Sequence, residues 1–309
     1  MTILQEAQAL FRRGRREEAV ALVEREAEAG DSEALFALAN WRLYGLYAAR
    51  DAAAAHPLLA RAAALDHAEA ARLRASLVAS GTGCAADPAQ ALALLRALDP
   101  ADPQIALVEA MDDRLPASEP LSDDPPLCLL RALFSAAECA YLIALAGPAL
   151  RPSVIVDAET GRPKPDPVRT SDGMNFGPAQ EDLVVNALNR RIAAATATPY
   201  ECGEPLHVLR YVPGQEYRPH LDALPGVDNQ RSWTALVYLN GGYQGGETVF
   251  PEIGLAAKGE PGDCLTFRNV DAEGRGDPRT RHAGAPVTGG VKWLASRWIR
   301  ERPFDPFAR

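Results

Sequence analysis

The first third of the chain carries apolar residues at helical spacing. From residue 3 to about residue 98 the sequence is rich in Ala, Leu, Arg and Glu, and apolar positions recur every three to four residues. The segment also resembles itself at an offset of 36 residues, so that Gly45 corresponds to Gly81 and Asp51 to Asp87. A helix pair of that length cannot bury its apolar face alone. The pattern therefore predicts stacked helix pairs.

Beyond residue 126 the period of the apolar positions changes. A helix is predicted in FSAAECAYLIALAGPAL, with Ser135 as its N-cap and Glu138 as the capping-box partner. After it come short apolar or alternating runs such as LHVLRYV, WTALVYL, CLTF and VKWLASRWI, separated by turn-forming stretches such as PGQE, NGGYQGG and KGEPGD. Short strands between Gly- and Pro-rich turns predict an antiparallel sandwich or barrel.

The stretch between these two regions is dense in Pro, Asp and Ser. Proline prevents a helix from continuing and acidic residues favour solvent, so residues 99–126 are predicted to be a linker, interrupted by a short helix near 105–111. We therefore expect an α-helical repeat domain at 1–98 and a second domain at 127–309. The expected fold class is α+β multidomain, with helices first and strands after them.

Composition and charge narrow the classes of function. The net charge of −9 argues against a nucleic-acid partner, because a phosphate backbone is bound mainly through excess positive charge. No uncharged apolar run reaches about eighteen residues, so no membrane span is expected. The N-terminal sequence MTILQEAQALFRRGRREEAV lacks the order of a signal peptide, which favours the cytoplasm. The five cysteines form no CxxC pair, which indicates reduced thiols.

A candidate metal site lies in the second region. His220 and Asp222 are separated by one residue, and on a strand such residues point to the same face. His282, in RTRHAGAPV, supplies a third ligand from another strand. Two imidazoles and one carboxylate form the facial triad of non-haem iron(II) oxygenases, which leaves three coordination positions open. The alternative is two structural histidines and an aspartate that begins a turn.

The open positions predict a 2-oxoacid cosubstrate. Its carboxylate and keto oxygens can chelate the iron and leave one position for O2. The distal carboxylate of 2-oxoglutarate then needs a buried cation. Lys292 follows His282 by ten residues, across a Thr-Gly-Gly turn, and can return on the next strand. A charge-assisted hydrogen bond of this kind contributes about 1.5–3 kcal/mol. The alternative for Lys292 is a surface lysine at a strand end.

The blocks LHVLRYVPGQEYRPHLDA, LVYLNGGYQGGETVFPEIGL, KGEPGDCLTF and HAGAPVTGGVKWLASRWI together resemble the catalytic domain of prolyl 4-hydroxylases, over residues 127–304. The resemblance implies a double-stranded β-helix (jelly roll) with supporting helices. It also implies an enzyme that hydroxylates an unactivated C–H bond with Fe(II), 2-oxoglutarate and O2, for which ascorbate is a candidate reductant. The longer loop NVDAEGRGDPRTRH before the distal histidine departs from the family pattern.

The same resemblance implies roles for further side chains. Those expected to contact 2-oxoglutarate are Tyr211 and Thr248, and those expected near the substrate are Tyr217, Arg231, Trp298 and Arg169. Three of them have a structural alternative: a core aromatic for Tyr211, an edge-strand residue for Thr248 and a solvated charge for Arg231. Arg169 belongs to a stretch, residues 160–178, that we expect to form a loop over the active site or a disordered loop.

The helical region around GDSEALFALANWRLYG resembles SEL-one-type, tetratricopeptide-like repeats, and the alternative is a plain helical bundle. A repeat surface suits a polypeptide and could bind a protein partner. The resemblance to prolyl 4-hydroxylases implies a prolyl residue as substrate, and the repeat surface favours one in a peptide or protein. Two alternatives stay open: a free amino acid or small metabolite as substrate, and an interaction scaffold whose β domain is catalytically idle.

Overall fold

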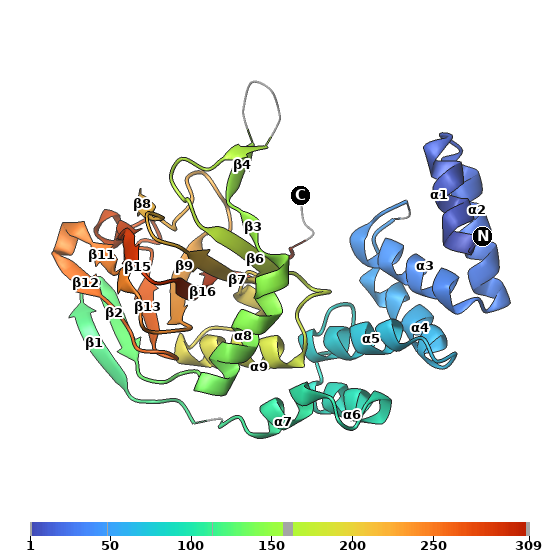
Figure 1. The fold of residues 1–309 in the computed structure, drawn as a ribbon, viewed down its shortest axis with the longest axis horizontal. Helices are drawn as coiled ribbons and strands as arrows, with labels where there is room; N and C mark the ends of the chain where they lie inside the picture. Colours follow the sequence, from blue (N-terminus) through green and yellow to red (C-terminus); the bar gives the residue numbers. More distant parts are fainter. Residues whose placement is uncertain (1, 48, 113, 157–162, 307–309) are drawn as a thin grey trace. The chain divides into compact units, whose positions relative to one another are not determined.

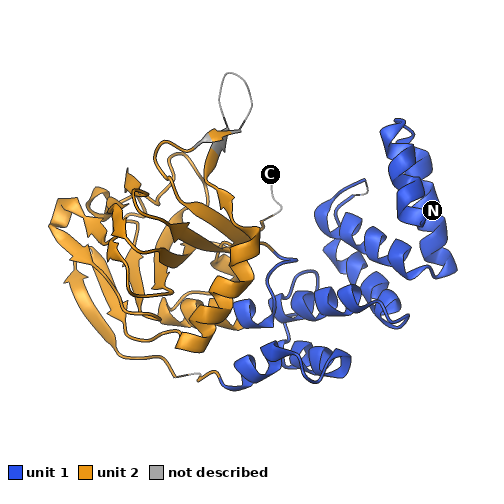
Figure 2. Ribbon diagram, in the orientation of Figure 1, with its two compact units in different colours: residues 1–110, 178–186, 307–309 blue, residues 111–177, 187–306 orange. Residues whose placement is uncertain are grey.

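The computed structural model describes residues 2–47, 49–112, 114–156 and 163–306 (Figure 1). The chain divides into two compact units, coloured separately in Figure 2. Unit 1 contains the chain up to residue 110 together with residues 178–186. Unit 2 contains residues 111–177 and 187–306.

Unit 1 is helical, as its periodicity predicts. Its first 110 residues form α1 (Ile3–Arg12), α2 (Arg16–Ala29), α3 (Ser32–Tyr44), α4 (Ala52–Ala63), α5 (Ala68–Ser80), α6 (Pro88–Leu98) and α7 (Pro103–Glu109). The residues that correspond at the offset of 36 have equivalent places. Gly45 and Gly81 end α3 and α5 in the left-handed conformation, while Asp51 and Asp87 cap the N-termini of α4 and α6. The assignment to a particular repeat type stays a prediction.

The core of unit 1 is made of small and branched apolar residues. Ala34, Leu35, Leu59 and Ala70 are among the side chains that are fully buried between successive helices. Alanine at these positions lets neighbouring helices approach closely, and leucine fills the remaining space.

The predicted linker contains two ordered elements. Besides α7, it holds β1 (Ser118–Asp123), which pairs antiparallel with β2 (Pro126–Leu130) at the edge of a sheet. Asp102 caps α7 by accepting a hydrogen bond from the Gln104 amide, and Ile105 is buried. Strand pairing and capping therefore order a stretch that composition alone assigns to solvent.

Unit 2 is built around two antiparallel sheets. The main sheet has the order β1, β2, β13 (Cys264–Arg268), β9 (Arg231–Tyr238), β16 (Lys292–Arg300), β7 (Leu206–Tyr211), β6 (Asp172–Phe176) and β3 (Arg151–Pro152). The minor sheet has the order β12 (Leu255–Ala257), β11 (Thr248–Phe250), β14 (His282–Gly284) and β8 (Tyr217–His220). Two short pairs remain: β10 (Gln244–Gly245) with β15 (Val287–Gly289), and β4 (Val154–Val156) with β5 (Pro163–Pro165).

Side chains from both sheets meet in one core. Leu209, Leu236 and Leu294 of the main sheet lie in the same buried cluster as Phe250 of the minor sheet. This is the sandwich that the strand alternation predicted, and the expected fold class, helices followed by an antiparallel β domain, is confirmed.

Two helices support the main sheet of unit 2. The predicted capping box is present in α8 (Ala136–Ala146), where Ser135 accepts from the Glu138 amide and Glu138 accepts from the Ser135 amide. Glu138 also pairs with Arg191 of α9 (Leu183–Ala195) at 2.9 Å. Because both side chains are nearly buried, this pair holds the two helices together in unit 2.

The stretch expected to be a loop at 160–178 is partly strand. Residues 160–162 lie outside the described part of the chain, 163–165 form β5, and 172–176 form β6 beside β7. Local polarity and the prolines suggested a loop. Instead β5 pairs with the nearby β4, and β6 pairs with β7, a strand distant in sequence.

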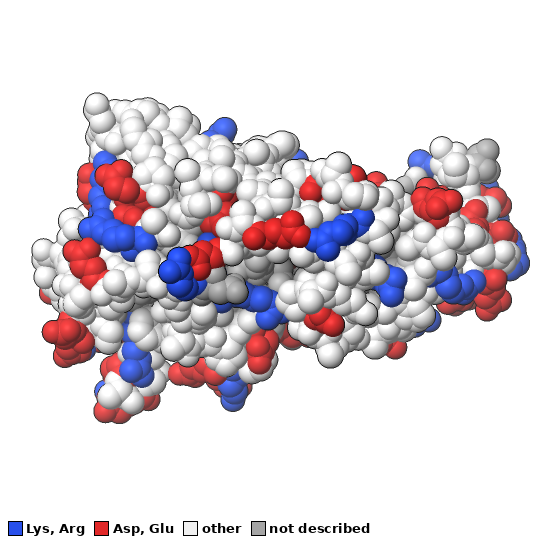
Figure 3. Space-filling view, turned by 90° about the horizontal axis from the view of Figure 1, so that it is seen from below, with Lys and Arg blue, Asp and Glu red and all other residues white. Residues whose placement is uncertain are grey.

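Within the described residues, none of the helices has both the length and the apolar character needed to cross a lipid bilayer. On the face seen in Figure 3, basic and acidic residues are interspersed, so that side visibly carries no large patch of one sign.

Candidate functional site

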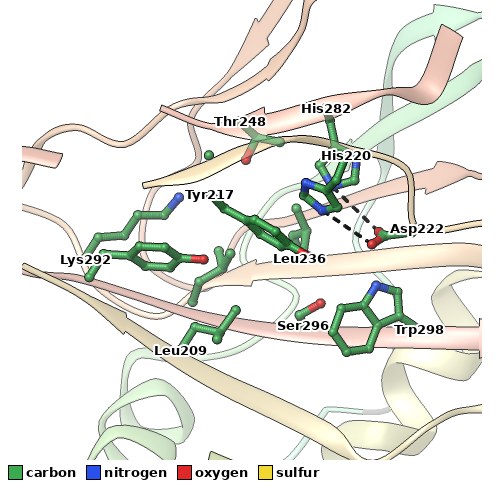
Figure 4. A pocket seen from close by; sticks show the side chains of 13 residues that line it. Leu209, Tyr217, His220, Asp222, Leu236, Thr248, His282, Lys292, Ser296 and Trp298 are labelled. Carbon is green, nitrogen blue, oxygen red and sulfur yellow. Dashed lines mark ion pairs between the residues drawn. The ribbon is translucent and has the colours of Figure 1, made fainter. Parts of the chain in front are cut away.

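The three predicted metal ligands come together where β8 and β14 pair. His220 is the last residue of β8, His282 is the first of β14, and the two are directly opposite in the ladder. Asp222 follows β8 and turns toward both rings. Its carboxylate oxygens lie 3.6 Å from His220 Nε2 and 3.7 Å from His282 Nε2 (Figure 4). One donor atom from each residue lies within 4.8 Å of the others.

Backbone carbonyls orient both imidazoles. Nδ1 of His220 lies 2.9 Å from the Arg218 carbonyl oxygen, and Nδ1 of His282 lies 3.1 Å from that of Thr280. A carbonyl only accepts, so each Nδ1 carries the proton and each Nε2 presents its lone pair toward Asp222. Burial lowers the pKa of His282 to about 4, which keeps its ring neutral near pH 7.

Two buried polar side chains hold Asp222. The Thr234 hydroxyl donates to Asp222 Oδ2 at 2.6 Å, and Asn269 Nδ2 donates to Thr234 Oγ1 at 2.9 Å. Burial by itself would raise the pKa of Asp222, and the hydrogen bond from the Thr234 hydroxyl opposes this by favouring the ionised carboxylate. Sequence reasoning missed both partners. The available signal was a threonine on the inward face of an otherwise apolar strand, with Leu236 two residues on.

This donor set fits Fe(II). Two neutral imidazole nitrogens and one ionised carboxylate are the ligands of non-haem iron(II) centres. Hydrogen bonds to the two Nδ1 atoms and from Thr234 to Asp222 fix the orientation of these ligands. Asp222 and His282 are both 4% exposed, so the site is shielded from bulk water on the protein side. The three residues would hold the metal on one face and leave the cavity side open.

The triad lies at one side of a cavity between the two sheets. The main sheet lines it with every second residue of β16, from Lys292 to Trp298, as a strand period of two requires. Figure 4 shows Lys292 and the triad at opposite sides of this pocket. A cosubstrate with a carboxylate at each end would therefore reach the metal position with one end and Lys292 with the other.

Lys292 is a buried cation, not a surface lysine. It is 3% exposed, and its Nζ donates to the Gly246 carbonyl oxygen at 2.7 Å. The rings of Tyr211 and Tyr238 lie 5.5 and 5.7 Å from Nζ. Burial lowers the pKa of Lys292 to about 8, so the ammonium is present at pH 7 but held at an energetic cost. A carboxylate entering the cavity would offset that cost.

Both residues expected to contact 2-oxoglutarate line the cavity. Tyr211 is buried, and burial raises its pKa to about 12, so its phenol stays protonated and can donate. Thr248 is 2% exposed, and its hydroxyl lies 3.2 Å from the Tyr238 hydroxyl. The structure therefore gathers Tyr211, Thr248 and Lys292 with the triad around one space.

Of the four residues expected near the substrate, two line the cavity. Tyr217 stacks on the His220 ring, with centroids 3.5 Å apart and planes 17° apart. Trp298 forms part of the opposite wall, and its buried Nε1 has no hydrogen-bond partner among the described residues. These rings flank the metal site with flat apolar surface.

The two arginines lie outside that cavity lining. Arg231 makes two hydrogen bonds to the Glu204 carboxylate, at 2.6 and 2.8 Å, and its guanidinium lies 4.1 Å from the Trp298 ring centroid. It is therefore not a solvated charge but is paired with Glu204, a partner that sequence reasoning missed and that also pairs with Arg300. A role of Arg231 at the substrate stays a prediction. Arg169 lies 5.5 Å from the Tyr217 ring centroid and donates to Ser153 Oγ. Each guanidinium thus lies near an aromatic ring of the cavity lining, Arg231 near Trp298 and Arg169 near Tyr217.

Comparisons with known proteins agree with this geometry. The 2OG-Fe(II) oxygenase superfamily matches residues 206–300, which run from β7 to β16 and include the triad and Lys292. Prolyl 4-hydroxylase 1 of Arabidopsis thaliana is 36% identical over 203 residues, which cover 60% of this chain and 72% of the relative. Probable prolyl 4-hydroxylase 6 of the same plant is 38% identical over 209 residues, with coverages of 60% and 72%.

Among solved structures, the viral collagen prolyl hydroxylase vCPH from Paramecium Bursaria Chlorella virus-1, as its 2OG complex, is 28% identical to this chain. That match covers 56% of this chain and 95% of the viral protein, with a TM-score of 0.46. With relatives above 30% identity matched over more than two thirds of their length, this chain belongs to the 2OG-Fe(II) oxygenase superfamily and, within it, to the group of the prolyl 4-hydroxylases.

Proposed function

We propose that this protein hydroxylates a prolyl residue in a peptide or protein. As a 2-oxoglutarate-dependent dioxygenase it uses Fe(II), 2-oxoglutarate and O2. The observation that carries the proposal is the similarity to prolyl 4-hydroxylases, together with the superfamily match over residues 206–300, which hold every described residue that lines the cavity. The aromatic walls beside the triad support it.

Bound iron supplies the oxygen chemistry, and the chain supplies binding, orientation and the exclusion of water. Lys292 pairs with the distal carboxylate of 2-oxoglutarate, and the Tyr211 hydroxyl adds a neutral donor beside it. Thr234 keeps the Asp222 carboxylate turned toward the metal position. A cosubstrate fixed at both ends leaves the side near Trp298 free for the substrate.

The cavity lining favours a prolyl residue within a chain over a free amino acid. Tyr217 and Trp298 present flat faces on which a pyrrolidine ring can rest. Among the described residues that line the cavity, Lys292 is the one lysine or arginine, and it lies at the cosubstrate side.

Turnover on two substrate sets tests the proposal. Full-length protein with Fe(II), 2-oxoglutarate and O2 would be incubated with proline-rich peptides and, separately, with free amino acids. We expect succinate and a gain of one oxygen atom on a prolyl residue of the peptides, both abolished by His220→Ala. Activity confined to free amino acids would overturn the assignment of the substrate.

We further propose that unit 1 binds a protein, because stacked helix pairs expose a continuous face to a polypeptide. The test compares KM for a folded or extended protein substrate with KM for the short peptide that contains the same proline. A lower KM for the long substrate supports recruitment by unit 1. Equal values would contradict it.

A further inference from the structure

Two of the three lysines in this chain fasten the same loop. The Gly-rich loop, residues 240–247, connects β9 to β11 and includes the short strand β10. Lys292 donates to the Gly246 carbonyl oxygen at 2.7 Å. Lys258, which directly follows β12, donates to the Tyr243 and Gly245 carbonyl oxygens, each at 3.1 Å. Neighbouring carbonyls of one loop are thus held by two ammonium groups.

The ammonium group of Lys258 is held on one side by the loop. Two of its three donors go to the Tyr243 and Gly245 carbonyl oxygens. Its Nζ also lies 3.7 Å from Glu247 Oε1, as an ion pair, and 4.5 Å from the centroid of the Tyr243 ring. The side chain is 36% exposed, so its stem lies against the protein while its head closes the loop from outside.

The loop also pairs with β15 through β10, and the Gly246 amide donates to the Pro286 carbonyl oxygen, but its glycines leave the backbone permissive. Gly245 and Gly246 have φ of +67° and +70°, a region that glycine enters readily and that constrains it little. Gly246 is also packed tightly: a Cβ there would lie 3.1 Å from Lys292 Cδ and 3.3 Å from the Tyr243 ring. Small movements of this peptide would therefore reach Lys292 directly.

We propose that Lys258 is a positioning residue for the 2-oxoglutarate site. By holding the Tyr243 and Gly245 carbonyls it fixes the adjacent Gly246 carbonyl, and this carbonyl orients the Lys292 ammonium toward the cavity. Lys258 itself stays outside the cavity lining. The inference depends on the cosubstrate assignment and is independent of the prolyl substrate.

The first test is Lys258→Met in the full-length protein, which removes the donors and keeps an apolar stem over Tyr243. Anaerobic titration of the Fe(II)-loaded protein should show 2-oxoglutarate binding about tenfold weaker, the lower end of the loss typical when a supporting partner is removed. Fe(II) affinity should not change. In turnover, KM for 2-oxoglutarate should rise while kcat stays the same. An unchanged affinity for 2-oxoglutarate would overturn the proposal.

Two matched variants separate positioning from loss of charge. Lys258→Arg keeps the charge and donors and should restore most of the affinity. Arg15→Met removes an exposed cation that is likewise paired with a glutamate, Glu18, and should leave 2-oxoglutarate binding as in the wild type. If Arg15→Met weakens binding as much as Lys258→Met, the effect is one of net charge and the inference is wrong.

The second test asks whether Lys258 acts through Lys292. Lys258→Met combined with Lys292→Met should bind 2-oxoglutarate no more weakly than Lys292→Met alone, because coupled residues are not additive. Binding of 2-oxobutyrate, which lacks the distal carboxylate, should be the same in wild type and Lys258→Met. Full additivity, or an equal loss for 2-oxobutyrate, would contradict the proposal. These titrations need no prime substrate, so their failure is distinguishable from failure of prolyl hydroxylation.

Discussion

Replacing Lys292 by methionine should stabilise the protein without cosubstrate while it impairs 2-oxoglutarate binding. The ammonium lies in a cavity wall with one hydrogen bond, to the Gly246 carbonyl, and no paired carboxylate within hydrogen-bonding distance among the described residues. Methionine has a similar length and fills the same channel between the rings of Tyr211 and Tyr238. Burial of the Lys292 ammonium therefore lowers the stability of the protein without cosubstrate, and the distal carboxylate of 2-oxoglutarate offsets this loss.

The magnitude follows from the pKa of Lys292. Its fall from the usual 10.5 to about 8 means that burial disfavours the protonated form by roughly 3 kcal/mol. The variant loses the hydrogen bond and leaves the buried Gly246 carbonyl without its donor, which costs about 1–2 kcal/mol. The net expectation at pH 7 is a gain of about 1–2 kcal/mol, or roughly 2–4 °C in Tm for each kcal/mol.

The pKa shift of Lys292 sets the direction in which its contribution to stability changes with pH. Since the pKa of Lys292 in the folded protein, about 8, lies below the unfolded value of 10.5, the unfolded chain binds more protons between these limits. Wild-type stability from this group therefore rises as pH increases from 8 toward 10.5. The advantage of Lys292→Met should be largest at pH 7 and below, and should shrink above pH 8. Wild-type affinity for 2-oxoglutarate should fall over the same interval.

Thermal unfolding of both proteins, with and without 2-oxoglutarate, at pH 7 and pH 9.5 measures these quantities. Ligand should raise Tm of the wild type by binding only the folded state and should raise that of the variant little. A variant less stable than wild type at pH 7 would refute the reasoning, as would a stability difference that does not change between the two pH values.

Other changes probe the supporting contacts. Thr234→Val should weaken Fe(II) binding about 10–100-fold in anaerobic titrations because the Asp222 carboxylate loses its donor, and an unchanged affinity would remove Thr234 from the metal site. Gly246→Ala should destabilise the protein by about 1–3 kcal/mol in denaturant unfolding, because alanine is strained at positive φ, and a neutral result would count against the described loop. Glu204→Gln should raise KM for the peptide but not for 2-oxoglutarate by loosening Arg231 behind Trp298, and equal changes in both would show a general defect.

Several features follow from the sequence because they depend on near neighbours. The capping box at Ser135 and Glu138, and the glycine that ends α3, are set within a few residues of chain. The spacing of His220 and Asp222 is of the same kind, because alternation along one strand already points both side chains to one face. Lys292 was found by its distance from His282 across a glycine turn.

Other features were decided only by the tertiary structure, because strand register brings together residues that are distant in sequence. Thr234 and Asn269 support Asp222 through a sheet pairing that no local pattern encodes. Glu204 pairs with both Arg231 and Arg300 for the same reason, so a charge that appears free in the sequence is paired in the fold. Local sequence thus determines which groups share a face. The pairing of whole strands determines which of them meet, and burial then sets their charge and hydrogen bonding.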